Sequence, residues 1–222
     1  MMARRSVAVI GLSAFGTTLV RELARRRVRV LAVDKDPAQV DAVRDVADEA
    51  VIADAADRRA LEALRLNDYS SVVLSLGSSL DASLLAVLHL RDLKVHPIIA
   101  KATSEDHRRL LLHLGVEEAI FPEADMAERV AHTLATPGLL DALQIGNDIE
   151  VVEVAPERDL LGRTLAELDL RNRFGINVVA VRDTLRDVTE VTPAPSLRIT
   201  DSLVLVVLGR TAAIERFSQR AK

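Results

Sequence analysis

The residues best suited to binding chemistry form a short turn near the N-terminus that contains two glycines. Gly11 and Gly16 follow the apolar run 7–10 and enclose the start of a segment with helical spacing. A turn between a first strand and a first helix is typical of nucleotide-binding folds, because the free N–H groups of the helix N-terminus attract phosphate. The turn consists of Gly11, Leu12, Ser13, Ala14, Phe15 and Gly16, and we expect the N–H groups at the start of its helix to attract phosphate.

An acidic residue stands at the distance that such a turn requires. Asp34 ends the second apolar run, 18 residues after Gly16 (34 − 16). A carboxylate at this place accepts hydrogen bonds from ribose hydroxyls and repels a 2′-phosphate, which disfavours NADP. Ser13 replaces the middle glycine of the motif, and we expect its side chain to crowd the approach of a dinucleotide pyrophosphate. The alternative is a tight turn that binds nothing.

Further candidate ligands follow the later apolar runs. Ligands of open α/β sheets collect at the carboxyl ends of parallel strands, where these residues are expected to lie. Asp54 is equally well placed to be the N-cap of the next helix, and Lys101 is equally able to face solvent. The expected cleft residues beyond the turn are Asp34, Lys35, Asp54, Ala55, Leu76, Gly77 and Lys101.

The first 120 residues alternate between β-branched runs and segments with helical spacing. The runs are continuously apolar, as expected for strands covered by helices on both faces. They predict an α/β fold, a Rossmann-like doubly wound parallel sheet. The expected strands are 7–10, 28–33, 50–53, 71–76, 97–100 and 119–121. The expected helices are 15–27, 37–46, 57–64, 82–93 and 104–114.

The pattern changes after residue 122. One long helix is expected at 123–136, ended by Pro137 and Gly138. Strand-like runs at 150–155, 176–182, 187–191 and 202–208, with short helices at 165–169 and 211–219, predict a small α+β domain. We expect an N-terminal domain at 1–136 that includes the long helix, a linker at 137–148 and a second domain at 149–222.

Composition excludes several classes of function. The chain of 222 residues is 49% hydrophobic and 28% charged, which allows a packed core. A net charge of −4 and 2% aromatic residues argue against a nucleic-acid partner. The absence of cysteine excludes disulfides and thiolate zinc sites. No apolar run approaches the roughly 20 residues of a membrane-spanning helix, and the lack of a recognisable acid–base set predicts that the protein is not an enzyme.

Several segments, in order along the chain, resemble the RCK domains of bacterial KtrA/TrkA-type potassium uptake proteins. The similar segments of the first domain are 8–16, 30–34, 51–55, 100–102 and 122–126. Those of the second domain are 169–175, 178–181 and 193–195. The resemblance covers nearly the whole chain, and its collinear order is more specific than any single motif.

The resemblance implies a cytoplasmic regulatory subunit at the inner face of the cell membrane. Dimers of such subunits assemble into an octameric ring beneath a KtrB/TrkH-like, potassium-translocating membrane protein. ATP or ADP, or NAD(H) in some relatives, binds the Rossmann cleft and controls ion uptake. Residues 11–16 would then hold phosphates, Asp34 the ribose, and Asp54 with Ala55 the adenine, while Lys101 lines the cleft. Glu123 matches an acidic residue that helps to hold a divalent cation near paired γ-phosphates.

The resemblance also implies a second ligand and marks two departures. In some relatives, paired C-terminal domains bind cyclic di-AMP, and Arg171, Asn177 and Pro193 stand in matching places. The alternative is a loop arginine and an asparagine that begins a strand. Relatives commonly have Gly and Arg where this chain has Ser13 and Ala14, and that arginine reaches a terminal phosphate.

Two other classes of function remain as alternatives. An NAD-dependent oxidoreductase with a minimal second domain needs an intact middle glycine and a proton donor near the cleft, and neither is recognisable. A nucleotide-sensing transcription factor needs a helix-turn-helix with clustered Lys and Arg, and the first strand begins too early to leave room for one.

Overall fold

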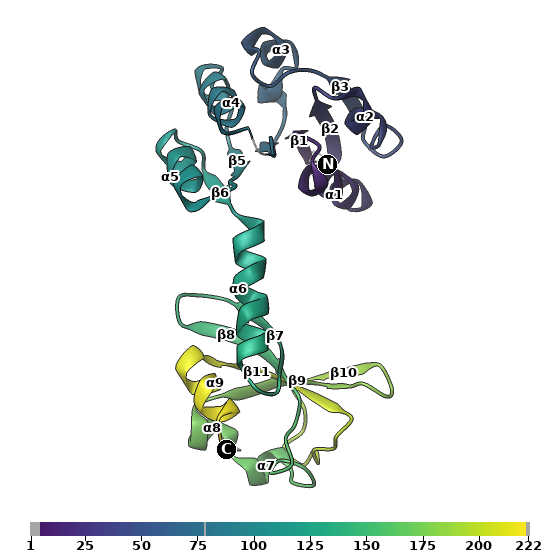
Figure 1. The fold of residues 1–222 in the computed structure, drawn as a ribbon. Coiled ribbons are helices and arrows are strands. Elements are labelled where there is room, and N and C mark those ends of the chain that lie inside the picture. The colour runs from purple at the N-terminus through teal and green to yellow at the C-terminus, as the bar shows by residue number, and fades with distance from the viewer. Residues whose placement is uncertain (1–4, 78, 221–222) are drawn as a thin grey trace. The chain divides into compact units, whose positions relative to one another are not determined.

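The computed structural model describes residues 5–77 and 79–220, which form two compact units that divide between Glu123 and Ala124 (Figure 1). The first unit holds a six-stranded parallel sheet in the order β3-β2-β1-β4-β5-β6. Its strands are β1 Ser6–Ile10, β2 Arg29–Asp34, β3 Glu49–Ile52, β4 Ser71–Leu74, β5 Ile98–Lys101 and β6 Glu118–Ile120. Its helices are α1 Ala14–Arg25, α2 Pro37–Asp41, α3 Arg58–Ala63, the 3₁₀ turn η1 Leu66–Asp68, α4 Leu80–Asp92 and α5 Glu105–His113.

The strand order reverses between β1 and β4, which confirms the doubly wound fold that the sequence predicts. Successive residues of β1 point to opposite faces, and each face has its own core. Ala8 and Ile10 pack in a cluster with residues of α3, α4 and α5, whereas Val9 packs with residues of α1 and α2. Helices therefore cover both faces of the sheet (Figure 1), and the apolar runs are continuous because both sides of each strand are buried.

Helix α6, Pro122–Ala135, leads into the second unit, which holds a five-stranded antiparallel sheet. The strands lie in the order β10-β9-β11-β8-β7 and confirm the predicted α+β character. The edge-on contact of the Phe174 and Phe217 rings, with centroids 5.4 Å apart, anchors two of its helices to each other. The elements are β7 Leu139–Gln144, β8 Ile149–Val154, α7 Leu165–Leu168, α8 Leu170–Phe174, β9 Asn177–Asp183, β10 Val188–Val191, β11 Leu203–Arg210 and α9 Thr211–Ser218.

Three elements differ from the expectations. Strand β7 lies within residues 137–148, where a linker is expected. Its leucines and alanine favour helices locally, but pairing with β8 and burial of Leu139 and Ala142 make it a strand. Helix α8 has no counterpart among the expected elements. Helix α2 ends at Asp41 and is followed by turns, so it is shorter than the expected helix at 37–46.

A buried carboxylate lies in the sheet of the second unit. Glu150 on β8 is 0% exposed, and neither of its carboxylate oxygens accepts a hydrogen bond within the described residues. The nearest opposite group is His132 of α6, whose Nδ1 lies 3.5 Å from Oε2. Burial raises the pKa of Glu150, His132 opposes the rise, and Glu215 adds to it. This side chain therefore favours its protonated form and costs stability when it is ionised.

Replacing Glu150 by glutamine should stabilise the protein, because the amide keeps the shape and removes the buried charge. We expect a gain of about 1–3 kcal/mol in the free energy of unfolding near pH ~8. The raised pKa means that the folded state holds this proton more tightly than the unfolded state does. The wild type therefore loses stability as pH rises from the unfolded to the folded pKa of Glu150, and the gain of Glu150→Gln grows over that interval.

Thermal melting of both proteins from acid to mildly alkaline pH measures this effect. Glu153→Gln, on the same strand, is the matched control because Glu153 is only partly buried and is paired with Arg182. That control should show no such gain. A Glu150→Gln protein that melts no higher than the wild type at neutral and alkaline pH contradicts the interpretation.

Candidate nucleotide-binding cleft

Two glycines allow the turn between β1 and α1 to pack against its surroundings without side chains in the way. A Cβ atom on Gly16 would stand 1.9 Å from the carbonyl oxygen of Gly11. A Cβ on Gly11, where φ is +92°, would stand 2.3 Å from the carbonyl oxygen of Ser75. Only glycine fits either place, so the N-terminus of α1 comes close to the carboxyl ends of β1 and β4.

The carboxylate of Asp34 fixes this turn from the neighbouring strand. Its Oδ2 accepts a hydrogen bond of 2.6 Å from the N–H of Leu12, and its Oδ1 accepts one of 2.9 Å from the N–H of Asp36. The N–H of Gly11 donates to the carbonyl of Val33, one residue before Asp34. Each carboxylate oxygen has two lone pairs, so Asp34 retains acceptor capacity for a ligand hydroxyl while it holds the turn.

Ser13 contacts Ser75, which follows the neighbouring strand β4 and is not among the residues predicted from the sequence. Its hydroxyl lies 3.0 Å from that of Ser75, which follows β4 and is 1% exposed. Ser13 is the N-cap residue of α1 but makes no side-chain hydrogen bond to the helix, in contrast to the capping side chains of Asp36 and Ser104. Ser75 is the first residue after β4, and no motif in the sequence marks it, because its role depends on contact with Ser13, 62 positions earlier.

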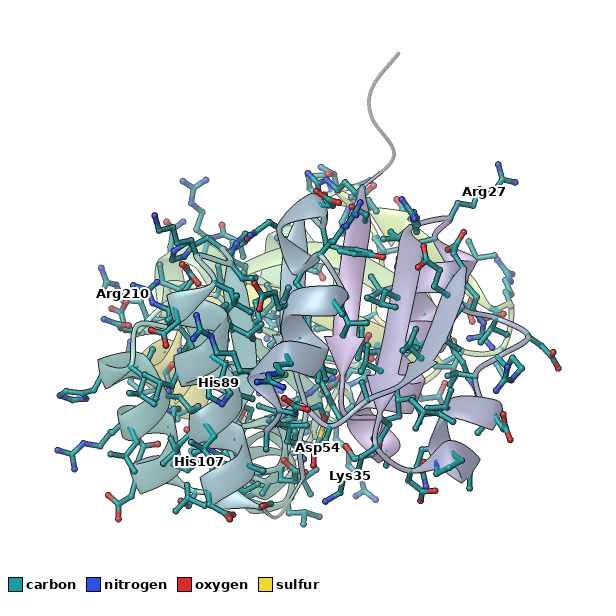
Figure 2. The ribbon with its side chains drawn as sticks, turned by 90° about the horizontal axis from the view of Figure 1, so that it is seen from above. Arg27, Lys35, Asp54, His89, His107 and Arg210 are labelled. Atoms are coloured by element: carbon teal, nitrogen blue, oxygen red, sulfur yellow. The ribbon has the colours of Figure 1, made fainter. Side chains whose placement is uncertain are left out.

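The other predicted residues of the first unit lie after neighbouring parallel strands and share this carboxyl edge. Figure 2 shows Lys35 and Asp54 at one end of the sheet and Arg27 at the other. Asp54 does not cap α3, as one alternative held, because Asp57 caps that helix and Asp54 accepts from the N–H of Ala56. The remaining members are exposed Ala14, half-buried Phe15, Leu76 and Gly77, and buried Ala55.

Lys35, which directly follows β2, adds a positive charge at the carboxyl edge of the sheet. The pKa of Asp81, in the first turn of α4, is lowered first by the hydroxyl of Ser79, then by backbone N–H groups and, more weakly, by Lys35. Lys35 thus has a weak electrostatic influence on the first turn of α4.

Lys101 and Glu123 form an ion pair on the other side of the edge. The Nζ atom of Lys101, the last residue of β5, donates to Oε1 of Glu123 at 2.5 Å. The Lys101 side chain is 10% exposed, whereas that of Glu123 is 61% exposed. The hydrogen bond from Lys101 holds the pKa of the Glu123 carboxyl below its usual range. A divalent cation at this carboxylate would need further oxygen ligands, since these ions take about six or more.

The three residues predicted for a second ligand line one pocket of the second unit. The pocket has a volume of about 250 Å³. Arg171 comes from α8, Asn177 begins β9, and Pro193 lies in the loop after β10. Leu165, Ala166 and Ile176 supply apolar walls. The fold thus brings the guanidinium of Arg171 and the amide of Asn177, six residues apart (177 − 171), together with a proline from a later loop.

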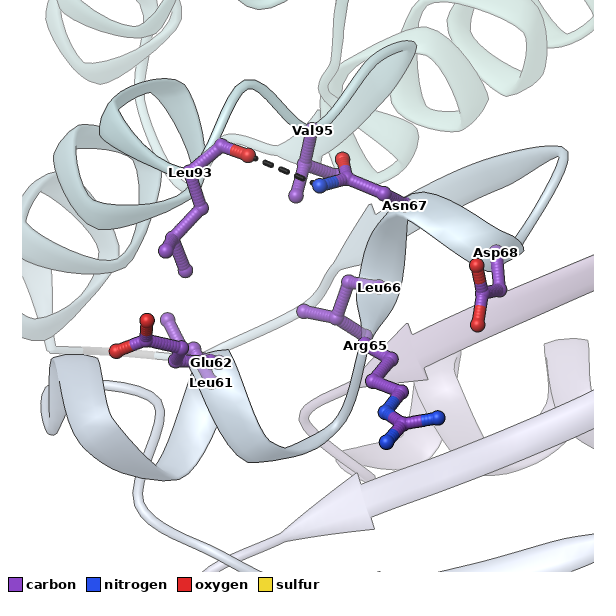
Figure 3. Close-up of a pocket in the computed structure, with 8 residues that line it drawn as sticks. All are labelled: Leu61, Glu62, Arg65, Leu66, Asn67, Asp68, Leu93 and Val95. Atoms are coloured by element: carbon purple, nitrogen blue, oxygen red, sulfur yellow. Dashed lines mark hydrogen bonds between the residues drawn. The ribbon is translucent and has the colours of Figure 1, made fainter.

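A further pocket, of about 420 Å³, lies at the opposite, amino end of the first sheet (Figure 3). Its walls come from α3, from η1 before β4, and from Leu93 and Val95 before β5. Asn67 donates to the carbonyl of Leu93 at 3.0 Å, as Figure 3 shows. This pocket shares no residue with the predicted cleft.

Residues 5–77 and 79–220 contain neither a cluster of metal-ligating side chains nor a helix that could span a membrane. No group of three or more His, Asp or Glu side chains in these ranges is arranged to hold a metal ion. No helix within them is long and apolar enough to cross a membrane.

Comparison with known proteins matches both halves of the chain. The TrkA-N domain model matches residues 7–122 and the TrkA-C domain model matches residues 149–222. The Ktr system potassium uptake protein C of Bacillus subtilis (strain 168) is 34% identical over 217 residues, which are 98% of this chain and 97% of that protein.

Solved structures agree on the fold. The GsuK channel bound to NAD is 20% identical, with a TM-score of 0.68, over 98% of this chain, which spans 40% of the GsuK chain. The NAD(P)-binding domain of an exopolyphosphatase-related protein from Archaeoglobus fulgidus is 28% identical, with a TM-score of 0.52, over 60% of this chain and 98% of that one. Together with the domain matches, these relatives confirm the resemblance that the sequence shows. The chain belongs to the family of RCK proteins that join a TrkA-N domain to a TrkA-C domain and include the Ktr system potassium uptake proteins.

Proposed function

We propose that this protein is the regulatory subunit of a bacterial potassium uptake system and that an adenine nucleotide in the cleft of its first unit controls uptake. The observation that carries the proposal is the glycine turn of residues 11–16, held by the carboxylate of Asp34 at the point where strand order reverses. This is the place where open α/β sheets bind nucleotides. The relative named for NAD(P) binding shares the fold of this unit and supports the proposal.

The residues present fit a nucleotide. Ser13 leaves the first N–H groups of α1 without a side-chain cap, so these groups and the helix dipole are suited to phosphate oxygens. Lys35 and Lys101 supply positive charge on either side. Asp34 has acceptor capacity for ribose hydroxyls, and Asp54 with Ala55 lies beside it for the adenine. The role of each of these residues is part of the proposal.

Control of uptake requires that the nucleotide favour one conformation over another. A ligand shifts such an equilibrium only by as much as its affinities for the two states differ. The Lys101–Glu123 pair offers a difference of this kind, because a phosphate near Lys101 competes with Glu123 for the ammonium group. Glu123 lies in the first turn of α6, so release of Glu123 changes the attachment of that helix to β5. A divalent cation bound by Glu123 requires further oxygen ligands from the nucleotide or a second chain.

A regulatory subunit acts through partners. We assign it to the cytoplasm, at the inner face of the cell membrane, with a KtrB/TrkH-like potassium-translocating protein as its partner. Met126, Val130 and Leu134 of α6 are exposed apolar side chains, which supports assembly of dimers into a ring such as the octamer implied by the family. A regulatory role also fits better than the oxidoreductase alternative, since the middle glycine of the motif is replaced by Ser13.

The pocket of the second unit supports a second ligand, cyclic di-AMP. A guanidinium pairs with phosphate or stacks on a base, and an amide reads a base edge. The volume of about 250 Å³ is below the usual range of about 300–1,000 Å³ for ligand sites. Two copies of the pocket related by two-fold symmetry would supply the remainder, which suits a two-fold symmetric ligand.

The role of Asp34 is tested by its replacement. Asp34→Ala should weaken ADP binding by about 1.5–3 kcal/mol, since it removes hydrogen bonds from ribose to a charged acceptor. Asp34→Asn keeps an acceptor for the N–H of Leu12, so it separates an effect on the turn from an effect on the ligand. Calorimetric titration with ADP measures both, and unchanged affinity in folded Asp34→Ala contradicts the assignment.

The second pocket is tested by thermal melting with cyclic di-AMP. A ligand that binds only the folded pair raises the melting temperature with concentration. Arg171→Ala and Asn177→Ala should each reduce this rise without changing ADP affinity, because their pocket belongs to the other unit. Arg186→Ala is the control, since its side chain is 82% exposed and does not line the pocket. If high micromolar cyclic di-AMP leaves the melting temperature of the wild type unchanged, the proposed second site is wrong.

A further inference from the structure

Two serine hydroxyls meet at the point where the strand order reverses. Ser13 follows β1 and Ser75 follows β4, and their Oγ atoms are 3.0 Å apart. The backbone of Ser75 is fixed, because its N–H donates to the carbonyl of Ile10 at 2.7 Å and its carbonyl lies under Gly11. This hydroxyl bridge therefore links Ser75, whose backbone is fixed after β4, to Ser13, which replaces the middle glycine of the motif.

This bridge lies where the two halves of a dinucleotide would meet. The pyrophosphate of a dinucleotide passes close to the backbone at the middle glycine, with one nucleoside on each side of the strand reversal. Asp34 on β2 and Asp54 after β3 belong to the adenosine side. The second nucleoside would have to pass the Ser13–Ser75 bridge to reach the side of β4 and β5. An adenine mononucleotide needs only the first side.

The bridge also keeps one O–H group that can donate a hydrogen bond to a phosphate. Between two hydroxyls, one O–H donates to the other, and the second hydroxyl keeps its own O–H for another acceptor. A terminal phosphate of ADP or ATP at the N-terminus of α1 is such an acceptor. The same pair that obstructs the second nucleoside can thus contribute a hydrogen bond to the end of a mononucleotide.

We infer that Ser13, through its contact with Ser75, makes the cleft select adenine mononucleotides over dinucleotides such as NADH. This inference rests on the proposed nucleotide-binding function and adds the residue that determines its specificity. Removing the side chain of Ser13 opens the crevice, while removing the hydroxyl of Ser75 only releases Ser13 from its anchor. The first change should therefore have the larger effect.

The experiment compares the Kd values of ADP and NADH by calorimetry for the full chain and three variants. Wild type should bind ADP more tightly than NADH. Ser13→Gly should shift the ratio of the two Kd values toward NADH by about tenfold or more, a difference of about 1.4 kcal/mol. Ser75→Ala should shift it in the same direction by less. Melting temperatures confirm that each variant is folded.

Ser70→Ala is the matched control. Ser70 exchanges hydrogen bonds with Ser6 between the same two strands at the amino end of the sheet, away from the cleft. It should leave the ratio unchanged. If wild type binds both ligands and Ser13→Gly leaves the ratio unchanged, or if wild type prefers NADH, this inference is wrong and the proposed function stands. If wild type binds neither ligand, the proposed function is wrong as well.

Discussion

The approach of α1 to the sheet is the constraint on which the cleft depends. A Cβ at Gly16 would be 1.9 Å from the carbonyl oxygen of Gly11, and a Cβ at Gly11 would be 2.3 Å from that of Ser75. Neither backbone can move away without breaking the core that continues from β1 into β4. Because both places hold glycine, the N-terminus of α1 lies at the strand reversal, and Asp34, Ser13 and Ser75 come within hydrogen-bond distance of the turn or of one another.

The first unit is largely predictable from its sequence because its determinants are local. Continuous apolar runs mark buried parallel strands, and the spacing of Gly11, Gly16 and Asp34 marks the cleft. Ser75 is different, since its role depends on contacts with residues more than sixty positions earlier in the chain. Strand β7 is likewise defined by its pairing with β8. The burial of Glu150 cannot be predicted from its sequence position, because it results from the packing of the folded unit.

The two units offer different kinds of interaction to their proposed ligands. The first offers backbone N–H groups, a helix dipole and lysines around a turn that glycine alone permits. The second offers the side chains of Arg171 and Asn177 in a pocket of about 250 Å³. The residues of the second pocket are brought together by the folding of α8 against β9, so their spacing in the sequence gives a weaker signal than the glycine turn does.

Hydrogen–deuterium exchange of the full chain with and without saturating ADP tests the central claim most directly, because it maps where the nucleotide acts. The account predicts slower exchange at the amides of residues 11–17 and 34–36, which form and brace the glycine turn of the proposed cleft. It predicts unchanged exchange at residues 61–68 and 93–95, which border the pocket at the amino end of the sheet. Protection at those residues, with none at 11–17, would contradict the account.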